Sequence, residues 1–200
     1  MLTRYTATAL CCVIGMLLYS TGALAETQFV VPAADFVGGC HSTFYWSNDS
    51  KHGEGYEERA ARKVSVFSRG VEGDSIAARF TLNAPPAAET QLRLVGLDDV
   101  KDGNVPVRVS LNGNVIHEGK TKFKDSPHIY GPRGWVTQTF EVPAGDFLAG
   151  DNELTIENLD EGHDDSLRWM FIHEAEFLFP GDEVEGKVKR GEDFLGRQYL

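Results

Sequence analysis

Residues 105–117 read VPVRVSLNGNVIH, and this stretch decides the fold. Apolar residues alternate with others as far as the pair Asn112-Gly113, and a second apolar run returns through Val115 and Ile116. An Asn-Gly pair suits the positive φ angles of a two-residue hairpin turn, and alternation with period two is typical of a strand with one buried face. The stretch therefore predicts a β-hairpin whose first strand turns one row of side chains to a core: Val105, Val107, Val109 and Leu111.

Short alternating runs bounded by Gly, Asn, Asp or Pro occur on both sides of this hairpin. Several short strands separated by regular turns, with no sustained helical spacing, are typical of β-sandwiches and jelly rolls. The sequence thus predicts an all-β protein, an antiparallel β-sandwich, with short helical turns only at 56–62 and 146–149. The rows expected to face the core are Ile76, Ala78, Phe80 and Leu82; Val136, Gln138, Phe140 and Val142; and Leu154, Ile156 and Asn158.

The run 169–179 is the most apolar of the expected strands. Strict alternation places Trp169, Phe171, His173, Ala175, Phe177 and Phe179 on one face, and Met170, Ile172, Glu174, Glu176 and Leu178 on the other. A strand that is apolar on much of both faces belongs in the middle of a sheet. We therefore expect a central strand, with Trp169 and His173 packed in the core.

Residues 1–25 have the features of a signal peptide: a basic residue at Arg4, an apolar middle, and the small residues Ala23 and Ala25 at the expected cut. The sequence predicts cleavage after Ala25 and export to the periplasm or the extracellular space, with no membrane insertion after cleavage. The remainder is long enough for one domain. We expect a sandwich at 26–180 and a mobile charged C-terminal tail at 181–200, with a contact to a protein partner as the tail's alternative role.

Charge and cysteine content narrow the classes of partner. The net charge of −11 repels phosphate backbones, so we expect no nucleic-acid partner. Cys11 and Cys12 lie in the expected leader, which leaves Cys40 alone and predicts a domain without an internal disulfide.

The order of several motifs resembles the galactose-binding-like jelly rolls. These motifs are LRLVGL at 92–97, VRVSLNG at 107–113, FEVPA at 140–144 and GDNELTI at 150–156, followed by the aromatic last strand. The similarity runs from about 64 to 179. The resemblance implies a carbohydrate-binding module, or an accessory sugar-binding domain of glycoside hydrolases and polysaccharide lyases, and hence a polysaccharide or oligosaccharide partner.

Residues 29–36, FVVPAADF, are similar to the opening strand of calcium-bearing carbohydrate-binding modules. In that group an acidic pair on the first strand meets a carboxylate of the last strand. Here alanine replaces one acid, which leaves Asp35, and the last strand supplies Glu174 and Glu176. Calcium takes six or more oxygen ligands. The resemblance therefore implies a structural calcium at these three residues, exposed solvated carboxylates are the alternative, and no cofactor is required.

Two loop segments combine aromatic rings with polar groups. A flat ring packs on the apolar face of a sugar ring, while amide, carboxylate and guanidinium groups bind its hydroxyls. The alternative for Trp46 and Trp135 is to close the ends of the sandwich. The candidate carbohydrate-binding residues are Tyr45, Trp46, Asn48, Asp49, Tyr56, His128, Tyr130, Arg133 and Trp135.

Three functions stay open on the sequence. The leading one is an exported non-catalytic module that binds carbohydrate. The second is a polysaccharide lyase or glycoside hydrolase on a jelly-roll scaffold, with Tyr130, His128 and Arg133 as base and charge neutraliser; the third is a protein-protein interaction domain. The sequence contains no Gly-x-Ser-x-Gly elbow, no phosphate-binding glycine loop and no nucleotide fingerprint, so no catalytic residue is assigned.

Overall fold

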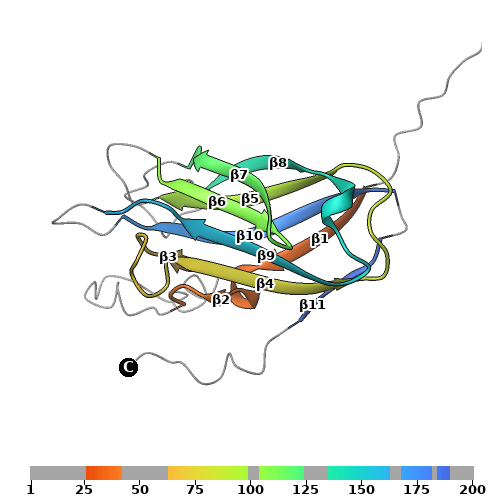
Figure 1. Cartoon of the computed structure of the whole chain (residues 1–200), viewed down its shortest axis with the longest axis horizontal. Coiled ribbons are helices and arrows are strands. Elements are labelled where there is room, and N and C mark those ends of the chain that lie inside the picture. Colours follow the sequence, from red (N-terminus) through yellow and green to blue (C-terminus); the bar gives the residue numbers. More distant parts are fainter. Residues whose placement is uncertain are drawn as a thin grey trace, which may run out of the picture.

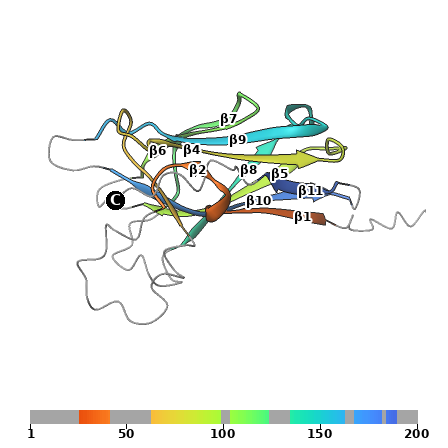
Figure 2. The same ribbon diagram turned by 90° about the horizontal axis from the view of Figure 1, so that it is seen from below.

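The protein is a sandwich of two antiparallel β-sheets, seen face-on in Figure 1 and edge-on in Figure 2. The computed structural model describes residues 26–41, 63–98, 104–123, 135–162, 168–181 and 184–189. Two short 3-10 turns, η1 (Ala33–Asp35) and η3 (Ala144–Asp146), accompany the strands. In this described part, no helix has the length and apolar character needed to cross a membrane. The predicted all-β sandwich is confirmed.

Sheet A has the strand order β1 (Glu26–Pro32), β10 (Met170–Pro180), β5 (Thr90–Asp98) and β8 (Val136–Val142). The short strand β3 (Val64–Val66) also pairs with β10, beyond the end of β1. Sheet B has the order β11 (Gly186–Lys189), β4 (Ser75–Leu82), β9 (Gly150–Asn158), β6 (Pro106–Leu111) and β7 (Asn114–Lys120), and β2 (Val37–Gly38) pairs with β4.

The hairpin predicted at 105–117 is β6 and β7. Leu111 pairs with Asn114, so Asn112 and Gly113 form a two-residue turn. Both have positive φ, 53° and 82°, which is the backbone geometry that favours an Asn-Gly pair. This turn fixes the register that turns the row Val107, Val109 and Leu111 toward sheet A.

The core lies between the two sheets, and the predicted alternating rows build it. All four apolar side chains of the row in β4 are at most 3% exposed, and the same burial holds for the rows in β6 and β9. In β8, Gln138, Phe140 and Val142 are buried as expected. Phenylalanine rings fill the middle, where Phe177 lies 5.3 Å from Phe80 and 5.6 Å from Phe147 between ring centroids.

β10 is the central strand of sheet A, as predicted, but its two faces are not the predicted ones. The pairing with β5 shifts between Ile172 and Glu174, which marks a β-bulge at His173. The extra residue reverses the alternation. Met170 and Ile172 therefore share the core with Ala175, Phe177 and Phe179, while Phe171 points to the opposite face. The expectation that Trp169 and His173 lie in the core is wrong for this reason.

Both ends of the described domain differ from expectation as well. The opening strand ends at Pro32, and the predicted strand residues up to Asp35 form the turn η1. Part of the expected mobile tail at 181–200 is folded: Val184 is 4% exposed within the core, and Gly186–Lys189 forms β11 at the edge of sheet B. The domain thus extends beyond 180. The expected helical turn at 146–149 begins two residues earlier, as η3, and the one at 56–62 lies outside the described residues.

Candidate functional site

The outer face of sheet A carries a second apolar cluster, separate from the core. Leu97 on β5 and Phe171 on β10 pair across the sheet, and both are 0% exposed. Trp135, which precedes β8, and Trp169, which precedes β10, pack against these two residues and stay partly exposed. We call Trp135, Trp169, Phe171 and His173, with Leu97 beneath them, the aromatic patch.

The patch contains two pairs of rings in contact: Trp169 with Phe171, and Trp135 with His173. Trp169 lies 6.3 Å from Phe171 and 5.5 Å from Phe67, measured between ring centroids. Trp135 lies 5.3 Å from the imidazole of His173. The two tryptophans directly precede β8 and β10 and form a partly exposed aromatic surface. Such a surface pairs with the apolar face of a sugar ring.

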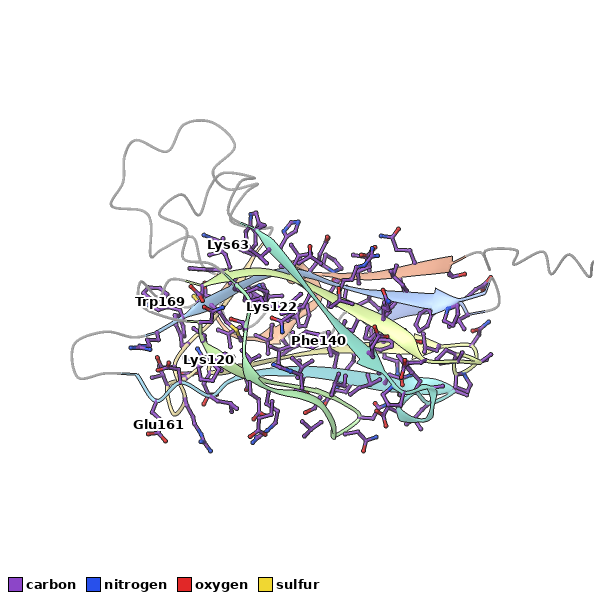
Figure 3. The ribbon with its side chains drawn as sticks, turned by 90° about the horizontal axis from the view of Figure 1, so that it is seen from above. Lys63, Lys120, Lys122, Phe140, Glu161 and Trp169 are labelled. Atoms are coloured by element: carbon purple, nitrogen blue, oxygen red, sulfur yellow. The ribbon has the colours of Figure 1, made fainter. Side chains whose placement is uncertain are left out.

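Lys63 adds a cation beside the patch. Its Nζ lies 4.9 Å from the centre of the Phe171 ring, and the residue is only 5% exposed. An ammonium at this distance from an aromatic face is attracted to the ring. Lys63 and Trp169 lie toward the same end of the sandwich in Figure 3, whereas Phe140 lies nearer its middle.

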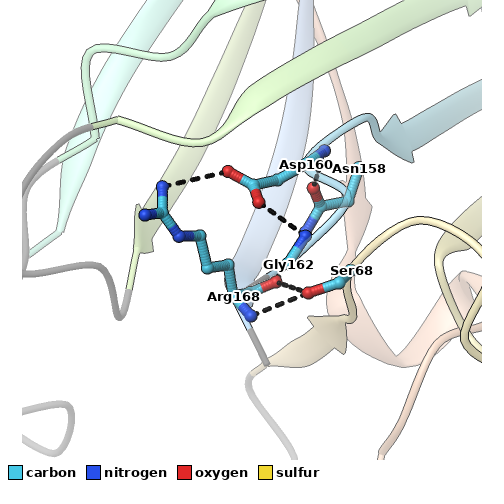
Figure 4. A network of polar contacts seen from close by, with 5 residues as sticks. All are labelled: Ser68, Asn158, Asp160, Gly162 and Arg168. Atoms are coloured by element: carbon cyan, nitrogen blue, oxygen red, sulfur yellow. Dashed lines mark hydrogen bonds and ion pairs between the residues drawn. The ribbon is translucent and has the colours of Figure 1, made fainter. Parts of the chain in front are cut away.

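A polar network holds Trp169 in place (Figure 4). The Ser68 hydroxyl donates to the carbonyl of Arg168 at 2.9 Å and accepts from the Arg168 amide at 2.7 Å. The Asn158 side chain donates to the same carbonyl at 3.0 Å, and the Arg168 guanidinium pairs with Asp160 at 3.2 Å. The network thus fixes the backbone just before Trp169, whose indole packs in the patch.

Polar side chains continue the outer face beyond the patch. The pairing register aligns Glu174 with Val95 and Thr137, and it aligns Glu176 with Arg93 and Thr139. Glu176 accepts hydrogen bonds from Gln28 and from Arg93, the latter at 3.5 Å. Glu174 lies 3.9 Å from the His173 imidazole. The patch is thus bordered by carboxylate and hydroxyl groups that can bind sugar hydroxyls.

The outer face of sheet B is different, because ion pairs between its own strands cover it. Arg79 contacts Glu153 at 2.7 Å, and Arg108 contacts Glu118 at 2.8 Å and Glu157 at 3.2 Å. These hydrogen bonds raise the pKa of both arginines above the usual value. The hydrogen bond to Glu153 does so for Arg79, and chiefly the one to Glu118 for Arg108. This face offers no described aromatic surface, so sheet A is the better candidate for binding.

Most carbohydrate-binding residues predicted from the sequence lie outside the described residues. Trp135 is the exception, and the structure places it in the aromatic patch, against Leu97 and Phe171. It therefore packs on the outer face of sheet A instead of closing an end of the core. The residues outside the described part are Tyr45, Trp46, Asn48, Asp49, Tyr56, His128, Tyr130 and Arg133.

The three carboxylates predicted to bind calcium do not come together. Glu174 and Glu176 lie on the outer face of sheet A, while Asp35 ends the turn η1 and lines a groove between β1 and β11, near Lys187. Among the described residues, no three His, Cys, Asp or Glu side chains are grouped as metal ligands. The geometry therefore does not fit a calcium site built from these three residues.

Sequence reasoning missed most of the patch. Trp169 and His173 were expected in the core, and Phe67 and Lys63 had no assigned role. One signal was available: the run 169–172 is apolar on both faces, so one face had to lie outside the core. The bulge at His173 determines which face lies outside, and the alternating pattern of the sequence does not reveal it.

Comparisons with known proteins give similarity in fold. No protein-family model and no curated protein matches the chain. Among solved structures, the CBM35 module of Cellvibrio japonicus Abf62 is 13% identical, with a TM-score of 0.45 over 83% of this chain and 99% of that one. A family 35 carbohydrate binding module from Clostridium thermocellum is 11% identical, with a TM-score of 0.42 over 76% of this chain and 97% of that one.

A CBM36 module in complex with calcium and xylotriose is 14% identical, with a TM-score of 0.40 over 74% of this chain and 98% of that one. At these identities the similarity concerns the fold alone. Carbohydrate-binding modules of families 35, 36 and 6 are thus among the solved structures that the chain matches over most of its length.

Proposed function

We propose that the protein is an exported, non-catalytic module that binds carbohydrate on the outer face of sheet A. The observation that carries the proposal is the aromatic patch, in which two partly exposed tryptophans pack on a buried Leu97–Phe171 pair outside the core. Each tryptophan directly precedes a strand and packs on the buried pair, so the surface is formed before a ligand arrives. Carboxylate and hydroxyl groups border it, which is the composition that sugar sites require.

Export through the leader at 1–25 is part of the same proposal, and it places binding in the periplasm or outside the cell. The enzyme alternative rests on Tyr130, His128 and Arg133, which lie outside the described residues. The interaction-domain alternative rests on the tail, part of which is instead strand β11. Neither alternative gains a specific observation from the described residues.

The test is calorimetric titration of the purified protein with a panel of soluble polysaccharides and their oligosaccharides. We expect at least one of them to bind. The variants Trp135→Ala and Trp169→Ala should each weaken that binding at least about tenfold, which corresponds to about 1.4 kcal/mol.

The matched control is Leu148→Ala, which truncates an apolar side chain that is 52% exposed and lies away from the patch. Its affinity should equal that of the unchanged protein. Circular dichroism of each variant checks that the sandwich still forms. No binding to any member of the panel, or binding that survives both tryptophan substitutions in folded protein, would overturn the proposal.

A further inference from the structure

We infer that the ligand is an uncharged glycan chain, which extends from the aromatic patch along β10 and β5 over the polar rows that contain Glu174 and Glu176. This inference rests on the proposed function, since it specifies the class of carbohydrate that the same face binds. The evidence is the arrangement of charges on the outer face of sheet A.

Carboxylates border the patch directly. The side chain of Glu174 is 34% exposed beside His173, and that of Glu176 is 13% exposed in the next row. A carboxylate oxygen accepts hydrogen bonds only, and those from hydroxyl groups are short and strong because the acceptor is charged. The hydroxyl groups of a neutral sugar are therefore suitable partners, chiefly for Glu174, the more exposed of the two.

The described cations beside these carboxylates are already offset or largely covered. The side chain of Arg93 is 41% exposed, but its charge is offset by Glu176 at 3.5 Å. Lys63 is only 5% exposed beside the Phe171 ring. A uronic acid group would thus approach two glutamates and a single exposed cation, Arg93, whose charge Glu176 already offsets. The net charge of −11 adds a long-range repulsion of the same sign.

The length of the surface indicates a chain instead of a single sugar. Residues 171 to 176 of β10 span roughly 16 Å, at about 3.3 Å per residue. Polar side chains repeat along this length, first Glu174 and Thr137 on either side of Val95, and then Glu176, Arg93 and Thr139. Each row can bind a successive sugar unit of an extended chain.

The experiment compares two polysaccharides that share a backbone but differ in charge. Polygalacturonate and its fully methyl-esterified form are titrated into the purified protein, together with the neutral polysaccharides and the oligosaccharides of the panel above. We expect binding of at least one neutral glycan, with affinity rising from the monosaccharide to the tetrasaccharide. Polygalacturonate should bind at least tenfold more weakly than the best neutral ligand and more weakly than its own ester.

A variant separates the charge effect from shape. Glu174→Gln keeps the size of the side chain and removes its charge, so neutral binding should weaken a few-fold while the preference against polygalacturonate shrinks. The control Glu153→Gln makes the same change on sheet B and should alter neither affinity. Tighter binding of polygalacturonate than of its ester would overturn this inference and leave the proposed function intact. Equal affinity for a monosaccharide and its tetrasaccharide would overturn the extended-chain part, and no binding to any glycan would overturn both proposals.

Discussion

At the scale of the residue, Asn152 shows how one buried amide fixes a turn. It is 3% exposed, and its Nδ2 donates to the carbonyls of Leu148 and Gly150 at 2.9 and 3.0 Å. Its Oδ1 accepts from the Leu148 amide and from the Asn112 side chain, both at 2.9 Å. The side chain thus ties the start of β9 to the turn of the β6–β7 hairpin.

Replacing Asn152 with alanine should therefore be strongly destabilising. Four hydrogen bonds disappear and buried backbone groups lose their partner, so we expect the free energy of unfolding to fall by about 2–4 kcal/mol. Urea denaturation measures the change. The control Asn114→Ala removes one exposed hydrogen bond, to Asp146 at 3.0 Å, and should stay within about 0.5 kcal/mol of the unchanged protein.

His41 should give the protein a pH dependence. Burial lowers the pKa of His41 below the ordinary histidine value of 6.5, and hydrogen bonds with the backbone of Phe36 and Gly38 oppose this only in part. The unfolded chain thus takes up a proton below pH 6.5 before the folded protein does, so acidification from that pH favours unfolding.

The measurement is the free energy of unfolding of the unchanged protein and of His41→Asn between about pH 7 and pH 5, the range around the ordinary histidine pKa. The unchanged protein should lose stability faster on acidification than the variant. The lost backbone hydrogen bonds shift the absolute stability of the variant, so only the slopes are compared. Parallel slopes would contradict this account.

At the scale of the element, β10 marks the boundary of what the sequence could predict. Its central position follows from the apolar character of both faces. The location of the candidate site does not follow, because the bulge at His173 exchanges the faces of the residues before it. A bulge depends on pairing with the neighbouring strand, which alternation within one strand does not report. Trp169 was therefore predicted in the core, although its neighbour Trp135 was predicted at the site.

The strand β11 packs closely at the edge of the sandwich because one of its residues, Gly186, has no side chain. A Cβ built on Gly186 would lie 2.7 Å from the ring of Phe29 and 3.1 Å from Leu82. Gly186→Ala should therefore force these core side chains apart and lower the free energy of unfolding by about 1–3 kcal/mol. The control is Gly145→Ala, where a Cβ meets nothing within 4 Å. Equal stability of the two variants in urea would show that β11 does not pack on the core as described.

At the scale of the whole molecule, the two outer faces have different chemistry. Sheet B is covered by ion pairs between its strands, such as Arg79 with Glu153, whereas sheet A carries the aromatic patch. A sandwich needs only its inner faces to be apolar. The patch is thus an addition to what the fold requires, and this addition is the structural basis of the proposed function.

The fold was more predictable than the site because local sequence patterns specify strands but do not specify which distant residues meet. Rows such as Ile76, Ala78 and Phe80 repeat locally, and each repeat specifies a strand with a buried face. The patch instead joins Leu97, Trp135 and Trp169, which come from distant parts of the chain and meet only through the pairing of β8, β5 and β10. The alternation of residues within one strand does not report such contacts between distant segments.

The central claim is that carbohydrate binds at the aromatic patch, and nitrogen-edited NMR of the indole groups tests it most directly. Trp135→Phe and Trp169→Phe assign two of the three tryptophan indole signals of the protein. On titration with a bound glycan, we predict that the signals of Trp135 and Trp169 move together with the backbone amide of Glu174, while the amides of Arg79 and Glu153 on sheet B stay fixed. Movement on sheet B with unchanged indole signals from Trp135 and Trp169 would contradict the account.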